Sequence, residues 1–129
     1  MGDEIQNQLE KPIHGFCSSI GTAGALMGVS NVLLRSKRKQ KIVALEPESA
    51  AFYSKGIRNG KHQVEGVGLG FELPLLDKDN FNEARGIDES EARLMVKKLA
   101  KHEGIFAGTS TGLNLVGALQ LAKEIGKGR

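Results

Sequence analysis

The sequence predicts an α/β fold built on parallel strands. Two observations carry this prediction: a strand, a turn of small residues and an amphipathic helix follow one another twice, and the first helix has a strand on either side. A strand–helix–strand unit of this spacing almost always has parallel strands. The 129 residues, 40% hydrophobic and 26% charged, have the composition of one globular domain. We therefore expect residues 1–129 to form a single α/β domain.

The first unit begins with residues 13–20, which read Ile-His-Gly-Phe-Cys-Ser-Ser-Ile and suit a buried strand. The small residues 21–25 then predict a tight turn. From residue 25 to residue 34, apolar side chains recur at the spacing of an amphipathic helix. Residues 41–45 predict a second strand, which ends before Pro47 because proline cannot continue a central ladder.

Residues 48–87 have no regular period, because glycines and Pro74 interrupt them repeatedly. A stretch of this length is too long for an ordinary connection, so we expect a functional loop region that contains short elements of its own.

Regular structure resumes at Asp88, where Asp-Glu-Ser-Glu resembles a capping box at the start of a helix. Gly104 is a plausible end for this helix. Residues 105–107 then predict a third short strand, residues 108–112 a second turn of small residues, and residues 115–122 a final amphipathic helix.

The first small-residue turn is a candidate anion site. At the carboxyl end of a parallel strand, backbone N–H groups and the positive end of a helix dipole favour anions. Small residues let a phosphate approach the backbone, and Thr22 can add a hydroxyl donor. The glycine spacing matches neither the dinucleotide fingerprint nor the Walker motif. A turn with a purely structural role therefore remains an alternative interpretation.

The second turn fits the Gly-x-Ser-x-Gly pattern of α/β hydrolases, with Ser110 as the nucleophile. In that fold the acid and the histidine follow the serine, whereas residues 113–129 contain neither aspartate nor histidine. A hydrolase triad cannot be completed here. Ser110 could equally cap the final helix and have no further role.

Other classes of function find little support. Cys17 is the only cysteine, which excludes an internal disulfide and fits a reducing compartment; we expect it to be a small core residue. We expect no metal site, because the soft-ligand candidates are few and scattered. They are His14, His62, His102 and Cys17.

We also expect neither a nucleic acid nor a membrane partner. No apolar stretch is long enough to span a bilayer and no signal peptide is present, so we expect a cytoplasmic protein. Five basic residues lie in one short segment without interleaved aromatic residues, which favours a solvated loop over a nucleic-acid surface. These residues are Arg35, Lys37, Arg38, Lys39 and Lys41.

Several segments together resemble the second half of the cysteine synthase and cystathionine β-synthase family, which are pyridoxal-phosphate enzymes of the tryptophan synthase β fold. The similarity runs in the same order over nearly the whole chain. It lies in Gly2-Asp-Glu-Ile, in residues 20–30 (Ile-Gly-Thr-Ala-Gly-Ala-Leu-Met-Gly-Val-Ser), in Val43-Ala-Leu-Glu-Pro, in the glycine-rich residues 60–71 and in residues 103–112.

The resemblance implies a three-layer parallel sheet with helices on both faces, as part of the large domain of that fold. It implies pyridoxal 5′-phosphate as the cofactor, an amino-acid substrate and a homodimer in the intact enzyme. Its reaction would be β-replacement on an O-activated serine with sulfide to give cysteine. The implied cofactor-binding residues are Gly21, Thr22, Ala23, Gly24 and Ala25 for the phosphate, Gly66 in a loop beside the cofactor, and Ser110 facing the pyridine nitrogen.

Two departures from the family pattern affect these expectations. The family's phosphate loop usually reads Gly-Thr-Gly-Gly-Thr, whereas here Ala23 replaces a glycine and Ala25 a threonine. The lost hydroxyl removes a hydrogen bond worth about 1–3 kcal/mol. None of the twelve lysines lies in a motif that matches the family's Schiff-base lysine. We therefore expect that lysine outside this chain, and we interpret the chain as a fragment of a longer enzyme. The alternative hypothesis is a non-catalytic phosphate-binding or interaction module.

Overall fold

The computed structural model describes residues 1–36 and 39–128. Within them one parallel sheet forms, with the strand order β1-β2-β3. Its strands are β1 (Gly15–Ser19), β2 (Lys41–Pro47) and β3 (Glu83–Ile87). Helix α2 (Gly24–Leu33) connects β1 to β2, which confirms the predicted strand–helix–strand unit. Lys37 and Arg38 of the basic segment lie outside the described residues.

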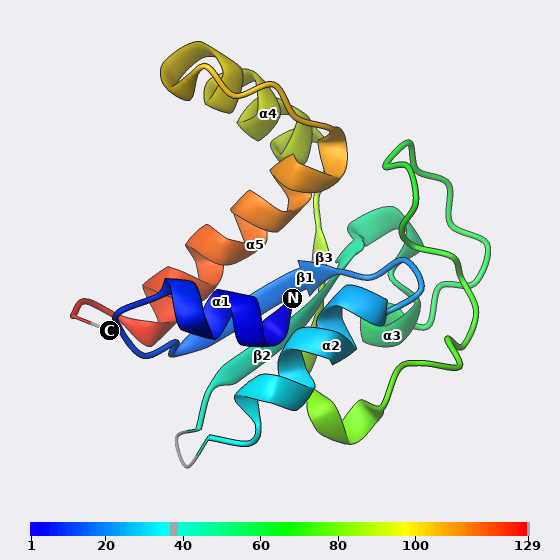
Figure 1. Cartoon of the computed structure of the whole chain (residues 1–129). Helices are drawn as coiled ribbons and strands as arrows, with labels where there is room; N and C mark the ends of the chain where they lie inside the picture. Colours follow the sequence, from blue (N-terminus) through cyan, green and yellow to red (C-terminus); the bar gives the residue numbers. More distant parts are fainter. Residues whose placement is uncertain (37–38, 129) are drawn as a thin grey trace.

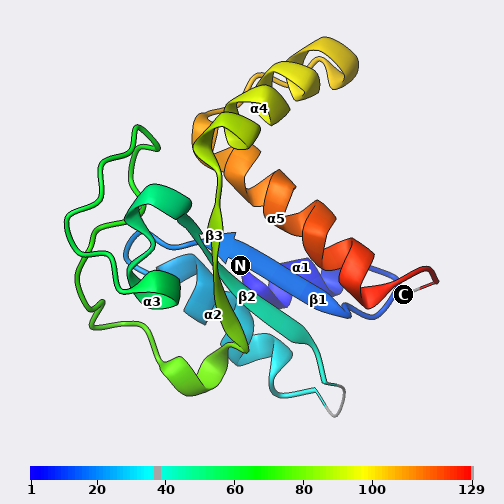
Figure 2. The ribbon, with the colours of Figure 1, turned by 180° about the vertical axis from the view of Figure 1, so that it is seen from behind.

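Helices cover both faces of the sheet, as Figures 1 and 2 show from opposite sides. Helices α1 (Gly2–Gln8) and α2 lie on one face, and α5 (Thr109–Ile125) lies on the other. Side chains of β2 alternate between two cores: Ile42 and Ala44 pack with α2, whereas Val43 and Leu45 pack with α5. The predicted three-layer α/β architecture is thus confirmed.

The third strand is not the predicted one. Residues 105–107 form no strand; they connect α4 (Glu89–Glu103) to α5, and Phe106 is 94% exposed. A strand needs a partner for its backbone groups, and in the described chain no neighbouring strand reaches this segment. Instead α4 packs beside α5, where the backbone of Gly112 lies so close to the Ala92 carbonyl that a Cβ on the glycine would fall 2.1 Å from that oxygen.

The strand that does form, β3, lies inside the region expected to be irregular. Its residues Glu-Ala-Arg-Gly-Ile show no clear apolar alternation, so the pairing with β2 rests on the backbone, in the register Val43↔Glu83 to Pro47↔Ile87. The rest of residues 48–87 contains the expected short elements: η1 (Glu48–Ala50), α3 (Phe52–Lys55) and η2 (Lys78–Asn80).

A buried carboxylate fixes α3 to the end of β2. Glu46, only 1% exposed, accepts hydrogen bonds from the backbone N–H groups of Tyr53 (2.9 Å) and Ser54 (3.0 Å) and from the Ser54 hydroxyl (3.1 Å). The Tyr53 hydroxyl in turn accepts a hydrogen bond from the Leu73 N–H group (2.6 Å). These contacts hold the irregular region against the sheet.

The start of α4 is capped as predicted. The Asp88 carboxylate accepts hydrogen bonds from the backbone N–H groups of Ser90 (2.6 Å) and Glu91 (3.4 Å), and Gly104 ends the helix with a left-handed φ of 68°. Hydrogen bonds from the Ser90 hydroxyl and backbone lower the pKa of Asp88.

Four charged side chains meet at the end of the sheet where the strands begin. Lys41 of β2 pairs with Glu124 of α5 (2.7 Å) and with Glu83 of β3 (3.2 Å). Arg85 pairs with the same two carboxylates, with 3.0 Å to Glu124. Hydrogen bonds from Lys41 and then Arg85 lower the pKa of Glu124. Burial raises the pKa of Glu83, but hydrogen bonds from Arg85 and Lys41 outweigh it, so the net shift is downward.

Candidate functional site

The first small-residue turn lies where β1 ends and α2 begins. Ile20, 2% exposed, continues the ladder by donating its N–H to the Leu45 carbonyl (3.1 Å). Helix α2 starts at Gly24, and within the described chain no side chain caps it and no acidic residue lies in its first turn. Among the described residues, no carboxylate or hydroxyl therefore caps the first backbone N–H groups of α2. Thr22, Gly24 and Ala25 are exposed, so an anion can reach these donors.

Ala23 makes the bend that this turn needs. It has φ 69° and ψ 1°, a left-handed conformation in which no other described non-glycine residue is found. An L-residue with a Cβ adopts it at a cost of about 1–2 kcal/mol. The methyl group is 3% exposed and packs in the α2-side core. The family's glycine is thus replaced by an alanine that still adopts the glycine-like backbone.

The glycine-rich loop of residues 66–70 lies directly against this turn. The Gly68 N–H donates to the Ile20 carbonyl (3.2 Å). A Cβ on Gly21 would fall 2.3 Å from the Gly66 carbonyl oxygen, so only glycine allows the two segments to approach this closely. Gly66 itself is exposed and has φ 78°. The structure therefore brings Gly66 beside the predicted phosphate loop.

Ser110 reaches the same end of the sheet from α5. One turn further along this helix, the Asn114 side chain accepts a hydrogen bond from the Ser19 N–H (2.7 Å), the last residue of β1. Residues four apart share a helix face, so Ser110 lies on the face of α5 that is turned to the end of β1. The sequence gives no sign of this role of Asn114, because a single asparagine within a helix carries no pattern of its own.

The alternative roles of Ser110 find no support in the geometry. Gly108 is the N-cap of α5 and no side chain caps that helix, so the interpretation of Ser110 as the cap is wrong. The hydrolase motif needs a strand before the serine, whereas residues 104–108 are without regular structure. Ser110 lies in the first turn of a helix, not on a strained strand-to-helix elbow.

Cys17 behaves as the expected core residue. It packs against the α5-side core, and its sulfhydryl donates to the Asn114 carbonyl, with 3.8 Å between sulfur and oxygen. Burial raises the pKa of the thiol, and the positive charge of Arg85 only partly offsets this. The thiol form is therefore favoured over the reactive thiolate.

The lysines do not gather at this site. Among the described residues every lysine is exposed except Lys41, which is half-buried in the ion-pair cluster at the other end of the sheet. A lysine that forms a Schiff base at neutral pH needs a desolvated or electropositive setting. The described part of the chain offers no lysine of that kind beside the glycine-rich turn.

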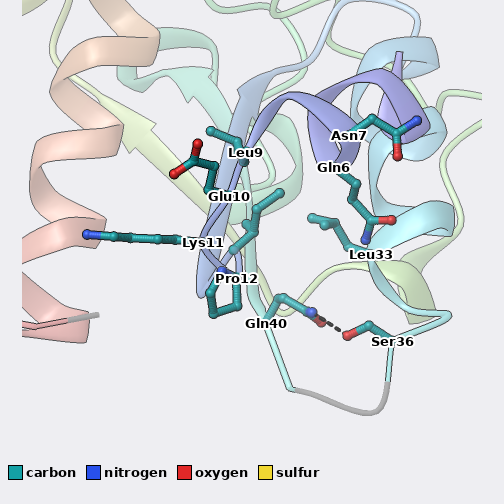
Figure 3. Close-up of a pocket in the computed structure, with 10 residues that line it drawn as sticks. Gln6, Asn7, Leu9, Glu10, Lys11, Pro12, Leu33, Ser36 and Gln40 are labelled. Carbon is teal, nitrogen blue, oxygen red and sulfur yellow. Dashed lines mark hydrogen bonds between the residues drawn. The ribbon is translucent and has the colours of Figure 1, made fainter.

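A separate hollow of about 500 Å³ lies at the opposite end of α2, beside the C-terminal part of α1 (Figure 3). Its floor includes Gln40, whose amide donates to the Ser36 hydroxyl (2.7 Å). Both Glu10 and Lys11 line it, so it shows no preference for anions. It is distinct from the turn between β1 and α2.

The described residues hold no cluster of three or more histidine, cysteine or acidic side chains placed to bind a metal ion. Over the same ranges, no helix has both the length and the apolar character required to cross a bilayer.

The uncapped N-terminus of α2 and the adjoining glycine loop fit an anionic group such as a phosphate. The sequence matches the family of pyridoxal-phosphate dependent enzymes over residues 1–129, and the chain belongs to that family.

Cysteine synthases and related enzymes are among the individual proteins to which this chain is similar. A cysteine synthase from Staphylococcus aureus is 38% identical over 99% of this chain and 41% of its own length. The crystal structure of a cysteine synthase from Entamoeba histolytica superimposes with a TM-score of 0.87 at 30% identity, covering 95% of this chain and 37% of that one. A hydrogen sulfide-producing enzyme from Fusobacterium nucleatum gives 0.90 at 34% identity, covering 98% and 38%. The chain thus spans about two fifths of the length of these relatives.

Proposed function

We propose that this chain supplies the cofactor-binding part of a pyridoxal-phosphate-dependent, cysteine synthase-like enzyme. The observation that carries the proposal is the uncapped N-terminus of α2 beside the loop of residues 66–70. The likeness to cysteine synthases over nearly the whole chain supports the same assignment. The substrate would be an O-activated serine, whose β-substituent is replaced by sulfide to give cysteine.

Each residue has a role in this proposal. The backbone N–H groups of residues 21–25 hold the phosphate, and the exposed Thr22 hydroxyl adds a donor. The Gly66 backbone forms the adjoining wall. The Ser110 hydroxyl hydrogen-bonds the ring nitrogen without holding it protonated. When bound, the cofactor supplies an electron sink for elimination and replacement at the β-carbon, and an unprotonated ring is the milder sink that such reactions need.

The reacting lysine comes from outside this chain in the proposal. The exposed lysines of the described residues support this, because none is desolvated near the turn. The isolated chain should therefore bind the phosphate and ring of the cofactor without making cysteine.

Calorimetry with two vitamers tests the proposal without lysine chemistry. Pyridoxine 5′-phosphate carries the ring and the phosphate but an alcohol in place of the aldehyde, so it forms no bond with lysine. We expect it to bind at least about tenfold more tightly than pyridoxine, because charge-assisted hydrogen bonds to the phosphate are the strong ones. Equal affinities for the two compounds would contradict a phosphate site.

A gain-of-affinity variant sharpens this test. Ala25→Thr restores the hydroxyl of the family pattern in the exposed first turn of α2. We expect the affinity for pyridoxine 5′-phosphate to rise about fivefold or more, as one hydrogen bond to a charged group allows. Ala25→Val is the matched control, because it has the same shape without the hydroxyl. If both variants bind alike, Ala25 does not face the phosphate.

A further inference from the structure

His62 lies in the irregular region, six residues before Gly68, and makes two hydrogen bonds through its two ring nitrogens. Nδ1 accepts the Val64 N–H (3.2 Å), and Nε2 lies 3.3 Å from the Gly68 carbonyl oxygen. A nitrogen that accepts an N–H must carry a lone pair, so the proton of the neutral ring is on Nε2, which donates to Gly68. Only this tautomer satisfies both contacts.

The ring thereby connects to the candidate cofactor site through Gly68. The Gly68 carbonyl accepts a hydrogen bond from His62, and the Gly68 N–H donates to the carbonyl of Ile20. Ile20 directly precedes the turn of residues 21–25. Gly68 has φ 65°, and a Cβ there would fall 3.0 Å from Nε2 and 3.1 Å from Pro47. The imidazole, Gly68 and Ile20 thus form one continuous series of contacts.

The segment that carries His62 is itself fixed to α4. The Gln63 N–H donates to Glu89 (3.1 Å), and Arg93, one turn further along α4, pairs with the same carboxylate. The hydrogen bond from Arg93 and then that from Gln63 lower the pKa of Glu89, so it stays ionised. His62 therefore contacts Gly68 from a segment that is held in place.

We propose that His62 is a positioning residue that holds the loop of residues 66–70 against the turn of residues 21–25 and so shapes the wall of the anion site. This inference rests on the proposed function, because the ligand of that site is the cofactor phosphate. His62 touches neither the turn nor its ligand; it acts through Gly68.

Substitutions can separate its two hydrogen bonds. In His62→Gln the side-chain amide can reach the position of Nε2 and donate to Gly68, whereas in His62→Asn the carbonyl can reach the position of Nδ1 and accept from Val64. His62→Leu loses both. His102→Leu, at an exposed position in the last turn of α4, is the matched control.

Two measurements are made on every variant: hydrogen exchange at the Gly68 amide and affinity for pyridoxine 5′-phosphate. We expect His62→Leu and His62→Asn to speed exchange about fivefold or more and to weaken binding about three- to tenfold, the effect of one lost hydrogen bond. His62→Gln should restore both values to within about twofold of the wild type. The long-range ¹H–¹⁵N spectrum of wild-type His62 should show a protonated Nε2 and an unprotonated Nδ1.

The outcomes distinguish this inference from the function on which it rests. If the wild-type chain does not bind pyridoxine 5′-phosphate, the proposed function fails, while exchange at Gly68 and the His62 tautomer still test whether His62 holds the loop. Unchanged exchange in His62→Leu, or a proton on Nδ1, overturns the positioning role. Faster exchange with unchanged binding overturns the connection to the site. Equal behaviour of the Gln and Leu variants overturns the assignment of the Gly68 contact.

Discussion

The two ends of the sheet are held together by different chemistry. Where the strands begin, the charged side chains of Lys41, Glu83, Arg85 and Glu124 pair with one another. Where the strands end, the main chain brings the loops together: the Gly68 N–H donates to the Ile20 carbonyl, and the Gly66 carbonyl lies so close to Gly21 that a Cβ there would fall 2.3 Å from its oxygen. At the amino end, each of these charged side chains has a partner of opposite charge within the protein. At the carboxyl end, the backbone N–H donors at the start of α2 are left for an anion that binds from outside.

The comparison predicts that the close approach of Gly21 to Gly66 tolerates no added side chain. Gly21→Val places atoms against the Gly66 carbonyl, where even a Cβ would lie 2.3 Å away. We expect the free energy of unfolding to fall by about 3 kcal/mol, because the neighbour is rigid backbone. Binding of pyridoxine 5′-phosphate should fall more than about tenfold, because the two loops move apart. Urea unfolding and calorimetry measure the two effects.

Gly28→Ala is the control for that prediction. A Cβ on Gly28, on the exposed face of α2, meets no atom within 4 Å. Alanine should therefore stabilise the helix by about 0.5–1 kcal/mol and leave binding unchanged. Equal losses of binding in both variants would show that the approach of Gly66 to Gly21 is not what shapes the site.

A substitution at the amino end of the sheet should lower the free energy of unfolding without changing the affinity for pyridoxine 5′-phosphate. Arg85→Met keeps the stem of a largely buried side chain and removes its hydrogen bonds to Glu83 and Glu124. We expect the free energy of unfolding to fall by about 1–2 kcal/mol. Affinity for pyridoxine 5′-phosphate should stay within about twofold of wild type. A large loss of affinity with unchanged stability would contradict the separation of the two ends.

Acid should weaken the amino end as well. The lowered pKa values of Glu83 and Glu124 mean that these carboxylates stabilise the fold above their unfolded pKa, about 4.3, and lose that contribution as pH falls through the folded value. This contribution to the free energy of unfolding should thus decline below about pH 4.5. Arg85→Met should flatten the decline; an identical slope in both proteins would exclude this cluster as its source.

The smallest effect concerns the strained residue of the phosphate turn. Ala23→Gly relieves a left-handed conformation that costs about 1–2 kcal/mol, but it loosens the unfolded chain by about 0.4–1 kcal/mol and removes a buried methyl group worth about 0.8 kcal/mol. We expect these effects to cancel to within about 0.5 kcal/mol in urea unfolding. Ala25→Gly removes an exposed methyl from a right-handed helical residue and should destabilise by about 0.5–1 kcal/mol. A loss of about 1.5 kcal/mol or more in Ala23→Gly would mean that Ala23 is not strained.

The sequence predicted the first unit well because its signals are local. The strand at residues 13–20, the turn and the helix that follows each have their own pattern, and the Asp88 cap and the Gly104 end of α4 are local signals too. The third strand was misplaced because strand formation depends on a partner. Residues 105–107 have strand-like composition without a neighbouring strand, whereas β3 pairs with β2 despite an unremarkable pattern.

In the candidate site, too, features with a local sequence signal were predicted, and contacts between distant segments were not. Residues 21–25 were found from their small side chains, and their pairing with Gly66 was implied by a resemblance. The contacts of His62 and Asn114 depend on segments distant in the chain. Helix α1, which packs on α2, was not anticipated either, because seven residues are too few to show a helical period.

The most direct test maps the bound ligand onto the amides of the protein. Pyridoxine 5′-phosphate is added to ¹⁵N-labelled chain, and chemical-shift changes are followed for each residue. The account predicts that the largest changes lie at residues 21–25, with smaller ones at residues 66–70 and Ser110. Changes centred on the hollow of Figure 3, or scattered over exposed lysines with residues 21–25 unmoved, would contradict it.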